Sequence, residues 1–431
     1  MRKEWSTLAL LFALMLVLTA CSQSSAISEP SDPKQANQLE IFSWWTGAGE
    51  EAGLQALLKV FTEKHPDIAV VNAAAAGGAG TNFKTVLATR IQKNKPPDTF
   101  QVHGGAELNE QWVAAGKMEP LNDLFTQQGW MDKFPASLVQ MVSKDGKIYS
   151  IPVNVHRSNV LWYNKKVFDQ YGLKPPATFD DFFKAADTLK AKGITPLALG
   201  DKEPWAATHL FESVLAGTLG PIDYNKLWSG HVHFDDPRIK LAFDTYKKML
   251  TYVNQDHANH NWQDSVQMVG KGEAAMTVMG DWAKGYLSND LELKLNQDFG
   301  FAPAPNTKGI FIAVTDTFGL PKGAKHPLAT KKFLEVIGSA EAQDAFNPIK
   351  GSIPARLDAD VNKYDEYGKT TIEDFKKDFI TPSLAHGSAA PQGFVAQCNQ
   401  LIHTFVAQGD VPSALTALKQ AATANHIGSK K

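Results

Sequence analysis

Strand-like and helix-like segments alternate along this chain of 431 residues, and this order constrains the fold more than any other feature. Residues 39–42 have the pattern of a strand, and apolar residues over 54–61 then recur at helical spacing until Pro66. The same order continues, with strands expected at 68–71, 98–102, 194–199, 274–279 and 311–314, and helices at 83–91, 178–189 and 333–337. The alternation predicts an α/β fold of open sheets flanked by helices. No internal repeat or long linker divides the mature chain, so its domains are expected to be interleaved.

Composition excludes several classes of protein. The 43 Lys and Arg against 45 Asp and Glu give a net charge of −2, without the basic excess typical of a nucleic-acid binder. The 24 Phe, 10 Trp and 9 Tyr can fill a large core, which excludes disorder as the main state. A mean hydropathy of −0.24 excludes a polytopic membrane protein. The chain is therefore expected to be globular, with room for two domains.

The N-terminus has the pattern of a secretory signal. Arg2 and Lys3 precede a short apolar run over residues 8–18, and the run ends in Thr19-Ala20-Cys21. This ending resembles the bacterial lipobox, in which the cysteine is lipidated and becomes the first residue. We expect a signal peptide over 1–20 and a lipid-anchored tether over 21–38, which would hold the protein in the periplasm or at the cell surface. The alternative is an ordinary signal peptide cut before Cys21. With Cys21 acylated, Cys398 would be the only thiol, and we expect it to be a buried apolar residue.

Polar and aromatic residues gather at the predicted carboxyl ends of the strands, where open α/β sheets bind their ligands. They are Trp44, Trp45 and Glu50 after the first strand, Gln101 and His103 at the end of the third, Asp281 and Trp282 after 274–279, and Thr315 and Asp316 after 311–314. Indole faces stack on the C–H faces of a pyranose, while carboxylates, amides and imidazoles exchange hydrogen bonds with its hydroxyls. The combination therefore indicates a sugar site.

The tryptophans divide into two predicted groups. Trp44 and Trp45 are neighbours and would face opposite sides of a strand, so we expect at least one of them to be exposed for contact with a ligand. Trp112, Trp162 and Trp228 lie in helix-like or strand-like patterns and are expected in the core.

Other chemistries are less well supported by the sequence. Residues 77–80 (GGAG) precede a helix but lack the Gly-Lys-Ser/Thr ending of a phosphate-binding loop. The histidine pairs at 231 and 233 and at 257 and 260 have no acidic or cysteine partners at ligand spacing, so we expect solvated loop histidines and no metal. Glu50 and Glu51 are neighbours, which does not suit a glycosidase pair. No Gly-x-Ser-x-Gly nucleophile motif is present.

Several stretches resemble the extracellular solute-binding proteins of ABC sugar importers, the family that includes maltose-binding protein. These stretches are 270–276 (GKGEAAM) with 280–282 (GDW), 149–154 (YSIPVN) with 161–165 (LWYNK), and 318–321 (FGLP) with the helix at 329–337. Within the family, 43–47 (SWWTG), 101–104 (QVHG) and 152–157 (PVNVHR) are similar to the bacterial glucose-binding branch.

The resemblance implies a two-lobed periplasmic-binding-protein fold with the ligand in the cleft between the lobes. The N-terminal lobe would comprise 39–154 and about 315–357, and the C-terminal lobe 155–314 and about 358–431. The implied sugar-binding residues are Trp44, Trp45, Glu50, Gln101 and His103 from the N-terminal lobe, Trp262 and Trp282 as stacking surface from the other lobe, and Asp316, Lys350 and His386 near the hinge and cleft wall, with Lys93 as a further candidate.

The same resemblance implies a function without catalysis, cofactor or metal. The protein would capture a monosaccharide, first glucose and otherwise galactose or mannose, and deliver it as a monomer to an ABC permease served by a separate ATPase. Two alternatives remain from the residues themselves. One is a secreted carbohydrate-active hydrolase or lyase that uses Glu50 with Asp316, and the other is a binding protein for an oligosaccharide or a polyol.

Overall fold

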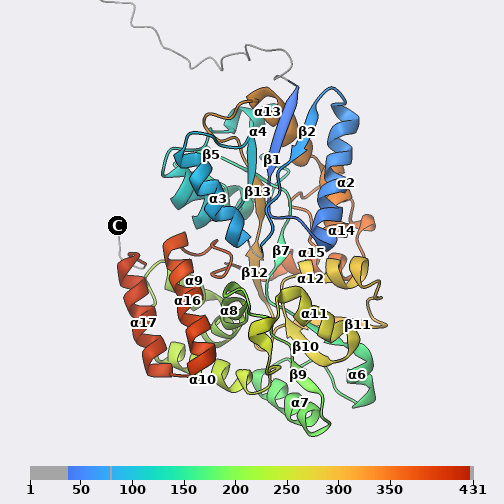
Figure 1. The fold of residues 1–431 in the computed structure, drawn as a ribbon, viewed down its shortest axis with the longest axis vertical. Coiled ribbons are helices and arrows are strands. Elements are labelled where there is room, and N and C mark those ends of the chain that lie inside the picture. The colour runs from blue at the N-terminus through green and yellow to red at the C-terminus, as the bar shows by residue number, and fades with distance from the viewer. Residues whose placement is uncertain (1–36, 78–79, 428–431) are drawn as a thin grey trace, which may run out of the picture.

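The described part of the chain, residues 37–77 and 80–427, forms two α/β lobes in the computed structural model (Figure 1). Each lobe has its own hydrophobic core. One core combines side chains from residues 39–155 and 311–355, and the other combines side chains from 161–312 and 384–422. Strand β12 (Ile310–Val314) contributes to both, because Ile310 and Ile312 face one core while Phe311 and Ala313 face the other.

The N-terminal lobe is built on a five-stranded sheet. Its strands, in spatial order, are β2 (Ala69–Asn72), β1 (Gln38–Phe42), β3 (Thr99–His103), β13 (Asp316–Phe318) and β6 (Ile151–Pro152). The first three strands pair in parallel, whereas β13 returns from far along the chain and pairs antiparallel with β3 and β6. This register places Asp316 opposite His103, so two candidate site residues become neighbours through a pairing between distant parts of the chain.

Helices and one hairpin complete the N-terminal lobe. They are α2 (Ala48–Lys64), α3 (Thr81–Gln92), the π-helix η2 (Glu107–Val113), α4 (Asn122–Gln127), α5 (Ala136–Met141), the hairpin of β4 (Ser143–Lys144) and β5 (Lys147–Ile148), α13 (Pro327–Ile337) and α14 (Ala340–Lys350). Helix α14 packs along α2. This packing brings the C-terminus of α14 beside the N-terminus of α2, where Lys350 meets Glu50.

The C-terminal lobe contains a four-stranded sheet in the order β11 (Phe299–Pro303), β8 (Val160–Asn164), β10 (Ala274–Val278) and β9 (Thr195–Leu197). Its helices are α6 (Lys165–Gln170), α7 (Phe179–Ala191), α8 (Trp205–Leu219), α9 (Pro221–Trp228), α10 (Pro237–Leu250), α11 (Trp262–Lys271), α12 (Trp282–Gly285), α15 (Glu366–Lys377), α16 (Gln392–Gln408) and α17 (Val411–Ala424), with the short turns η3 (His257–Asn259), η4 (Tyr286–Asp290) and η5 (Val361–Lys363). Helix α8 is buried along most of its length and packs against α10 and α16.

A small sheet at the junction joins the lobes. It consists of β14 (Phe379–Pro382), β12 and β7 (His156–Arg157). Arg157 is buried there and ties three segments together, since its guanidinium donates to Asp374 at 2.6 Å, to Asp378 at 3.2 Å and to the carbonyl of Ile310 at 3.1 Å. The residue beside it, His156, is thereby held on the crossing strand between the lobes.

The expected α/β fold is confirmed, and several local predictions are accurate. The predicted helix start at Thr178 is the N-cap of α7, where Thr178 and Asp181 exchange hydrogen bonds in a capping box. Cys398 is buried, as are Trp112 and Trp162, while Trp228 is half-buried against the core. The predicted signal peptide and Cys21 lie outside the described residues, and Gln38 at the end of the predicted tether already belongs to β1. The lobe boundaries stay a prediction.

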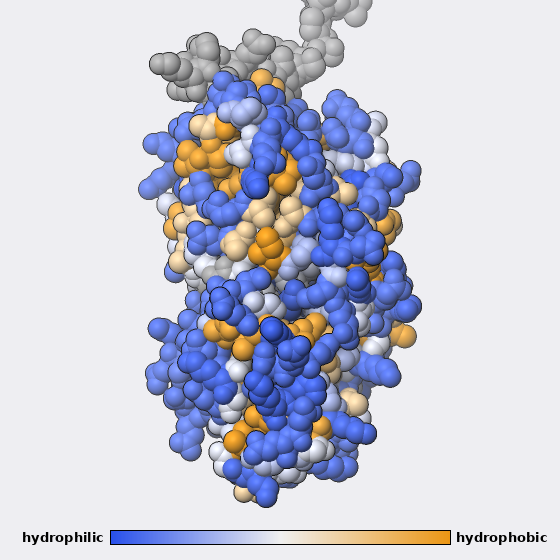
Figure 2. Space-filling model, turned by 90° about the vertical axis from the view of Figure 1, so that its right-hand side faces the viewer, coloured by the Kyte–Doolittle hydropathy of each residue, from blue (hydrophilic) through white to orange (hydrophobic). Residues whose placement is uncertain are grey.

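One face of the protein is largely polar. In the side view of Figure 2, hydrophilic residues cover most of the visible face, and apolar residues appear in smaller areas between them. Among the helices of the described residues, none is both long enough and apolar enough to cross a lipid bilayer.

Candidate functional site

A cavity of about 390 Å³ lies between the two lobes, and part of this space is open to solvent. Its walls are formed by Trp44, Trp45, Glu50, His103, His156, Trp205, Trp262, Trp282, Val314, Asp316, Lys350 and His386. All of these residues except Glu50 are buried, so the structure shows the lobes closed around the cavity.

The cavity brings together nine of the ten residues expected from the sequence. The tenth, Gln101, lies behind the wall, because its amide donates to Asp316 Oδ1 at 2.8 Å and accepts from the backbone N–H of Trp44 at 3.1 Å. Both the amide nitrogen and the amide oxygen of Gln101 are therefore hydrogen-bonded to residues of the wall. The further candidate Lys93 is exposed at the end of α3 and does not line the cavity.

Trp44 and Trp45 follow the carboxyl end of β1, but the expectation that one of them is exposed is wrong. Their exposed fractions are 6% and 1%. Gly80, with a positive φ of 74°, approaches the ring of Trp44 so closely that a Cβ atom would lie 2.9 Å from it. Trp45 packs against the rings of Phe318 and Phe346. Core packing and closure of the lobes cover both indoles, which contact the enclosed cavity instead of bulk solvent.

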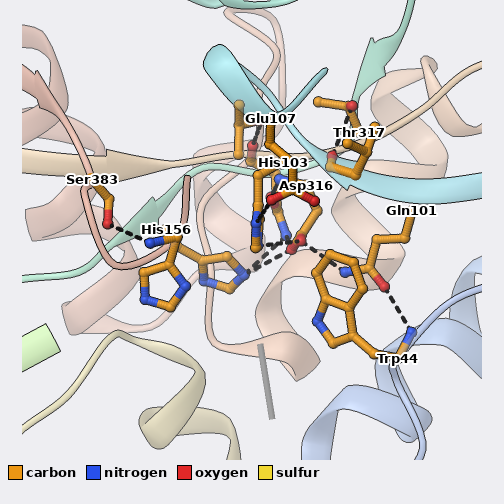
Figure 3. A network of polar contacts seen from close by, with 12 residues as sticks. Trp44, Gln101, His103, Glu107, His156, Asp316, Thr317 and Ser383 are labelled. Carbon is orange, nitrogen blue, oxygen red and sulfur yellow. Dashed lines mark hydrogen bonds and ion pairs between the residues drawn. The ribbon is translucent and has the colours of Figure 1, made fainter. Parts of the chain in front are cut away.

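Asp316 is the centre of a buried polar network at the start of β13. Its carboxylate accepts from Asn154 Nδ2 at 2.7 Å and from Gln101, and it forms ion pairs with His156 Nε2 at 3.3 Å and His103 Nε2 at 3.7 Å (Figure 3). Burial alone would raise the pKa of Asp316. The hydrogen bond from His156 and the charges of His156, His103 and Lys350 outweigh burial and hold that pKa well below its usual range. Asp316 is thus an ionised acceptor beside the cavity.

Three further ion pairs fix charged side chains in and behind the N-terminal wall. Lys350 Nζ lies 2.8 Å from Glu50 Oε1, where the C-terminus of α14 meets the N-terminus of α2. Glu107 Oε2 lies 2.9 Å from both His103 Nδ1 and Lys84 Nζ. Burial would raise the pKa of Glu107, but Lys84 and His103 lower it further than burial raises it. His103 is thereby held with its Nε2 toward Asp316.

Aromatic rings form the opposite wall. Trp282 lies at the start of α12, with its ring centroid 5.0 Å from that of His386 and 5.3 Å from that of His156. The ring centroid of Trp205 lies 6.3 Å from that of Trp282. Trp262 is the first residue of α11. The C-terminal lobe therefore offers flat apolar surface, while the N-terminal lobe offers most of the charge.

His386 belongs to a group of three buried side chains that resembles a metal site. The ligand atoms of His209, Glu212 and His386 all lie within 4.8 Å of one another, and no other such group of three occurs in the described part of the chain. However, both oxygens of Glu212 already accept hydrogen bonds from protein donors. His209 Nε2 is buried without a partner, whereas metal-bound histidines have a partner that fixes the ring. The group therefore gives no reason to propose a metal.

Of the two histidine pairs noted in the sequence, the pair at 231 and 233 is exposed, as expected, whereas the pair at 257 and 260 is half-buried and has acidic partners. His257 Nδ1 lies 2.6 Å from Asp201, and His260 Nε2 lies 2.8 Å from Asp256. His231 is exposed and pairs with Ser229. Acidic partners thus exist, but they form ion pairs.

Three lining residues were missed by reasoning from the sequence. Trp205 begins α8 after the loop that follows β9, so extending the search from the strand end into this loop would have found it. His156 and Val314 lie on the crossing strands β7 and β12. Residues 152–157, which include His156, resemble the glucose-binding branch of the family. His156 itself does not follow a predicted strand, so its position in the sequence did not indicate a role in the site.

The family profile of the bacterial extracellular solute-binding proteins matches residues 44–344. The chain belongs to this family. An uncharacterized ABC transporter extracellular-binding protein of Pyrococcus horikoshii is 41% identical over 425 residues, covering 97% of this chain and 95% of that protein. A probable sugar-binding periplasmic protein of Mesorhizobium japonicum is 34% identical over 404 residues, covering 91% of this chain and 94% of the relative.

Solved structures share the architecture of this chain. The bacterial solute receptor AcbH, described as having an exclusive preference for β-D-galactopyranose, superposes with a TM-score of 0.81 at 23% identity. The match covers 91% of this chain and 99% of that receptor. At this identity the similarity shows the shared two-lobed fold.

Glycines allow the two lobes of this solute-binding protein to approach closely beside the cavity. A Cβ atom at Gly285 of α12 would lie 2.7 Å from the carbonyl oxygen of Lys350, at the end of α14 in the other lobe. Asn289 Nδ2 donates to the neighbouring carbonyl of Ile349 at 2.7 Å. Carbonyls at a helix C-terminus lack partners within the helix, so the C-terminal lobe supplies one. The two lobes therefore contact each other directly at the edge of the cavity.

We therefore expect Gly285→Ala to hold the lobes apart and weaken ligand binding by about tenfold, on the order of 1.4 kcal/mol. Gly285 has a helical φ of −56°, so alanine is conformationally acceptable there. Titration calorimetry measures the affinity, and thermal unfolding should change little. Gly217→Ala is the matched control, since its Cβ would be crowded at 3.1 Å by Asn306 and Pro305 within one lobe. Equal ligand affinity in Gly285→Ala and wild type would contradict this role.

The buried carboxyl group of Glu212 should make the stability of the protein depend on pH. Burial raises the pKa of Glu212 to about 7, despite hydrogen bonds from Ser158, Ala385 and Ser383 that lower it. The folded protein keeps this proton at pH values where the unfolded chain has lost it, so the contribution of Glu212 to stability declines as pH rises from about 5 to about 7. Glu212→Gln cannot titrate. The free energy of unfolding of Glu212→Gln, minus that of wild type, should therefore increase from about pH 5 to about pH 7 in urea titrations. A difference that stays constant over this range would reject the raised pKa of Glu212.

Proposed function

We propose that this protein is the substrate-binding component of an ABC importer and that it captures a monosaccharide, with glucose as the first candidate. The observation that carries the proposal is a buried interlobe cavity lined by indole rings from both lobes and by fixed, charged hydrogen-bonding groups, most of them from the N-terminal lobe. A pyranose has both complementary surfaces, since its C–H faces stack on aromatic rings and its hydroxyls donate and accept.

The hydrogen-bond donors and acceptors in the cavity wall suit a polyhydroxy ligand. Asp316 is an ionised acceptor, and Lys350 is a donor on the same wall. The indole N–H of Trp45 is buried and has no partner, although Trp45 lines the cavity. A ligand oxygen would satisfy this donor, which otherwise costs about 1–3 kcal/mol to leave unpaired.

The closed form of the cavity supports a small ligand, because eleven of its twelve lining residues are buried and the lobes contact each other beside it. Galactose and mannose differ from glucose at one hydroxyl each and are the closest alternatives. Motifs at 43–47, 101–104 and 152–157 favour glucose through their resemblance to glucose-binding proteins.

The proposed mechanism is capture by closure, without a catalytic step. Sugar that contacts both lobes binds the closed form better and shifts the equilibrium toward it. A permease with a separate ATPase would then recognise the closed shape. Asp316 does not suit the role of proton donor in a hydrolase, because its pKa is lowered. We further propose that acylated Cys21 anchors the monomeric protein to the membrane through residues 21–38.

A thermal-shift panel of sugars tests the proposal. The mature protein, stripped of bound ligand by unfolding and refolding, is heated with glucose, galactose, mannose, maltose or sorbitol. Glucose at about 100 times its dissociation constant should add about 2.7 kcal/mol of stability. Stabilisation by maltose alone would favour the oligosaccharide alternative, and stabilisation by sorbitol alone the polyol alternative. Product formation from oligosaccharides would favour the hydrolase, and no shift with any monosaccharide would reject the proposal.

A further inference from the structure

His156 joins a carboxylate of one lobe to a carboxylate of the other. Its Nδ1 forms a short hydrogen bond with Asp281 Oδ1, and Asp281 precedes α12 in the C-terminal lobe. Its Nε2 lies 3.3 Å from Asp316 Oδ2, and Asp316 begins β13 in the N-terminal sheet. His156 itself lies on β7, in the small sheet that joins the lobes, and is 2% exposed. The three side chains form a carboxylate–imidazole–carboxylate chain across the junction.

The ring has no nitrogen left for a ligand, although it lines the cavity. Nδ1 is occupied by Asp281, and Nε2 faces Asp316 and the amide of Asn154, the latter at 3.0 Å. Asp281 is itself fixed, since its second oxygen accepts from the backbone N–H of Arg157 at 3.0 Å and from Tyr367 at 3.2 Å. His156 therefore acts on a sugar through Asp316.

We propose that His156 is a positioning residue that, as a cation held by Asp281, orients Asp316 for the sugar and makes sugar affinity depend on pH. This inference rests on the proposed function. When the ring is charged, Nε2–H donates to Asp316. When the ring is neutral with its proton on Nδ1, Nε2 becomes an acceptor, and the nearby Nδ2 of Asn154 is a donor for it. Loss of the proton thus removes the hydrogen bond from His156 to Asp316. It also makes Asn154 Nδ2, which donates to Asp316, a donor to His156 Nε2.

The charged surroundings favour the cation. Asp281 and Asp316 face the two nitrogens, while Lys350 at the end of α14 opposes the charge. Burial would lower the pKa of His156, but attraction to Asp281 and hydrogen bonds to both carboxylates raise it above its usual value. Of the other titratable neighbours, Tyr367 and Arg157 contact Asp281, and His103 contacts Asp316. The pKa of His386 is lowered by burial and by surrounding cations that include His156.

The sign of the pH effect follows from this pKa. Because the pKa is raised, the ring of His156 keeps its charge to higher pH than an ordinary histidine, and the charge is lost as pH rises through the raised pKa. Glucose affinity should therefore be constant below that pKa and fall by about tenfold above it, the size of one charge-assisted hydrogen bond.

The test is a set of glucose titrations by calorimetry from about pH 6 to about pH 10. In Asp281→Asn the neutral amide no longer stabilises the cation, so the fall in affinity should begin at lower pH than in wild type. His156→Gln keeps a donor but cannot titrate, so it should bind about tenfold more weakly than wild type at the acidic end of this range, and its affinity should not fall as pH rises. His326→Gln is the matched control. His326 is also buried and pairs with an aspartate, Asp98, at 2.6 Å, but it lies outside the cavity wall.

The outcomes separate this inference from the proposed function. If wild type binds no monosaccharide at any pH, the proposed function fails and the inference fails with it. If wild type binds glucose but Asp281→Asn has an unchanged pH profile, or His156→Gln binds as tightly as wild type, only the inference is overturned. A merely structural role for His156 would lower stability in these variants without moving the midpoint of the affinity profile.

Discussion

Glucose affinity should fall by about 10- to 100-fold when Asp316 is replaced by asparagine, while the protein still folds. Hydrogen bonds to a charged group contribute about 1.5–3 kcal/mol each, roughly twice the value for neutral pairs. Asparagine keeps the size of the side chain but removes the charge. It also turns one of the acceptors for Gln101 and Asn154 into a donor. Titration calorimetry with glucose measures the loss, and circular dichroism checks the fold.

The control for Asp316→Asn is a second buried aspartate with a histidine partner. Asp98 accepts from the ring of His326 at 2.6 Å and from the backbone N–H of Glu40 at 2.8 Å, away from the cavity wall. Asp98→Asn should lower the melting temperature without changing glucose affinity. If Asp316→Asn binds glucose as wild type does, Asp316 is not part of the sugar site.

Trp282→Leu should weaken glucose binding by at least about tenfold. The indole is 7% exposed and lies in the wall of the cavity. Its ring centroid is 5.3 Å from that of His156 and 5.0 Å from that of His386. Aromatic stacking contributes about 0.5–1.5 kcal/mol beyond area burial, and leucine also loses buried apolar contact with the sugar. Trp282→Phe keeps a smaller aromatic ring, so its glucose affinity should lie between that of the wild type and that of Trp282→Leu. The affinities come from the same calorimetric titrations.

A tryptophan in the N-terminal core separates loss of stacking from loss of stability. Trp130 packs against Phe125 and Phe134 and does not line the cavity. Trp130→Phe should lower the melting temperature and leave glucose affinity unchanged. An order of affinities in which Trp282→Phe or Trp282→Leu equals wild type would remove Trp282 from the site.

Much of the fold could be predicted because its elements carry local signals. Apolar periodicity over 54–61 lies within α2, and Thr178 caps α7. The position of β13 could not be predicted in this way. This strand pairs with β3 and β6 across more than 150 residues of chain, and nothing local in its three residues specifies that neighbour.

The candidate site was accessible from sequence to the extent that its residues follow strands. Trp44, Asp281 and Asp316 lie at strand ends, where ligands of α/β sheets bind. Lys350 and His386 lie elsewhere and were suggested only by family resemblance. The role of Gln101 behind Asp316 and the link made by His156 depend on side-chain geometry between lobes, which no local pattern encodes.

The most direct test of the proposed sugar site is calorimetric titration of D-glucose into the mature, ligand-stripped protein near neutral pH. We expect saturable binding at one site per chain, and binding weakened at least about tenfold in the double variant Asp316→Asn, Trp282→Leu. Absence of binding by glucose, galactose and mannose to the folded protein would contradict this expectation. So would glucose binding that the double variant leaves unchanged, because the ligand would then occupy some place other than the cavity between the lobes.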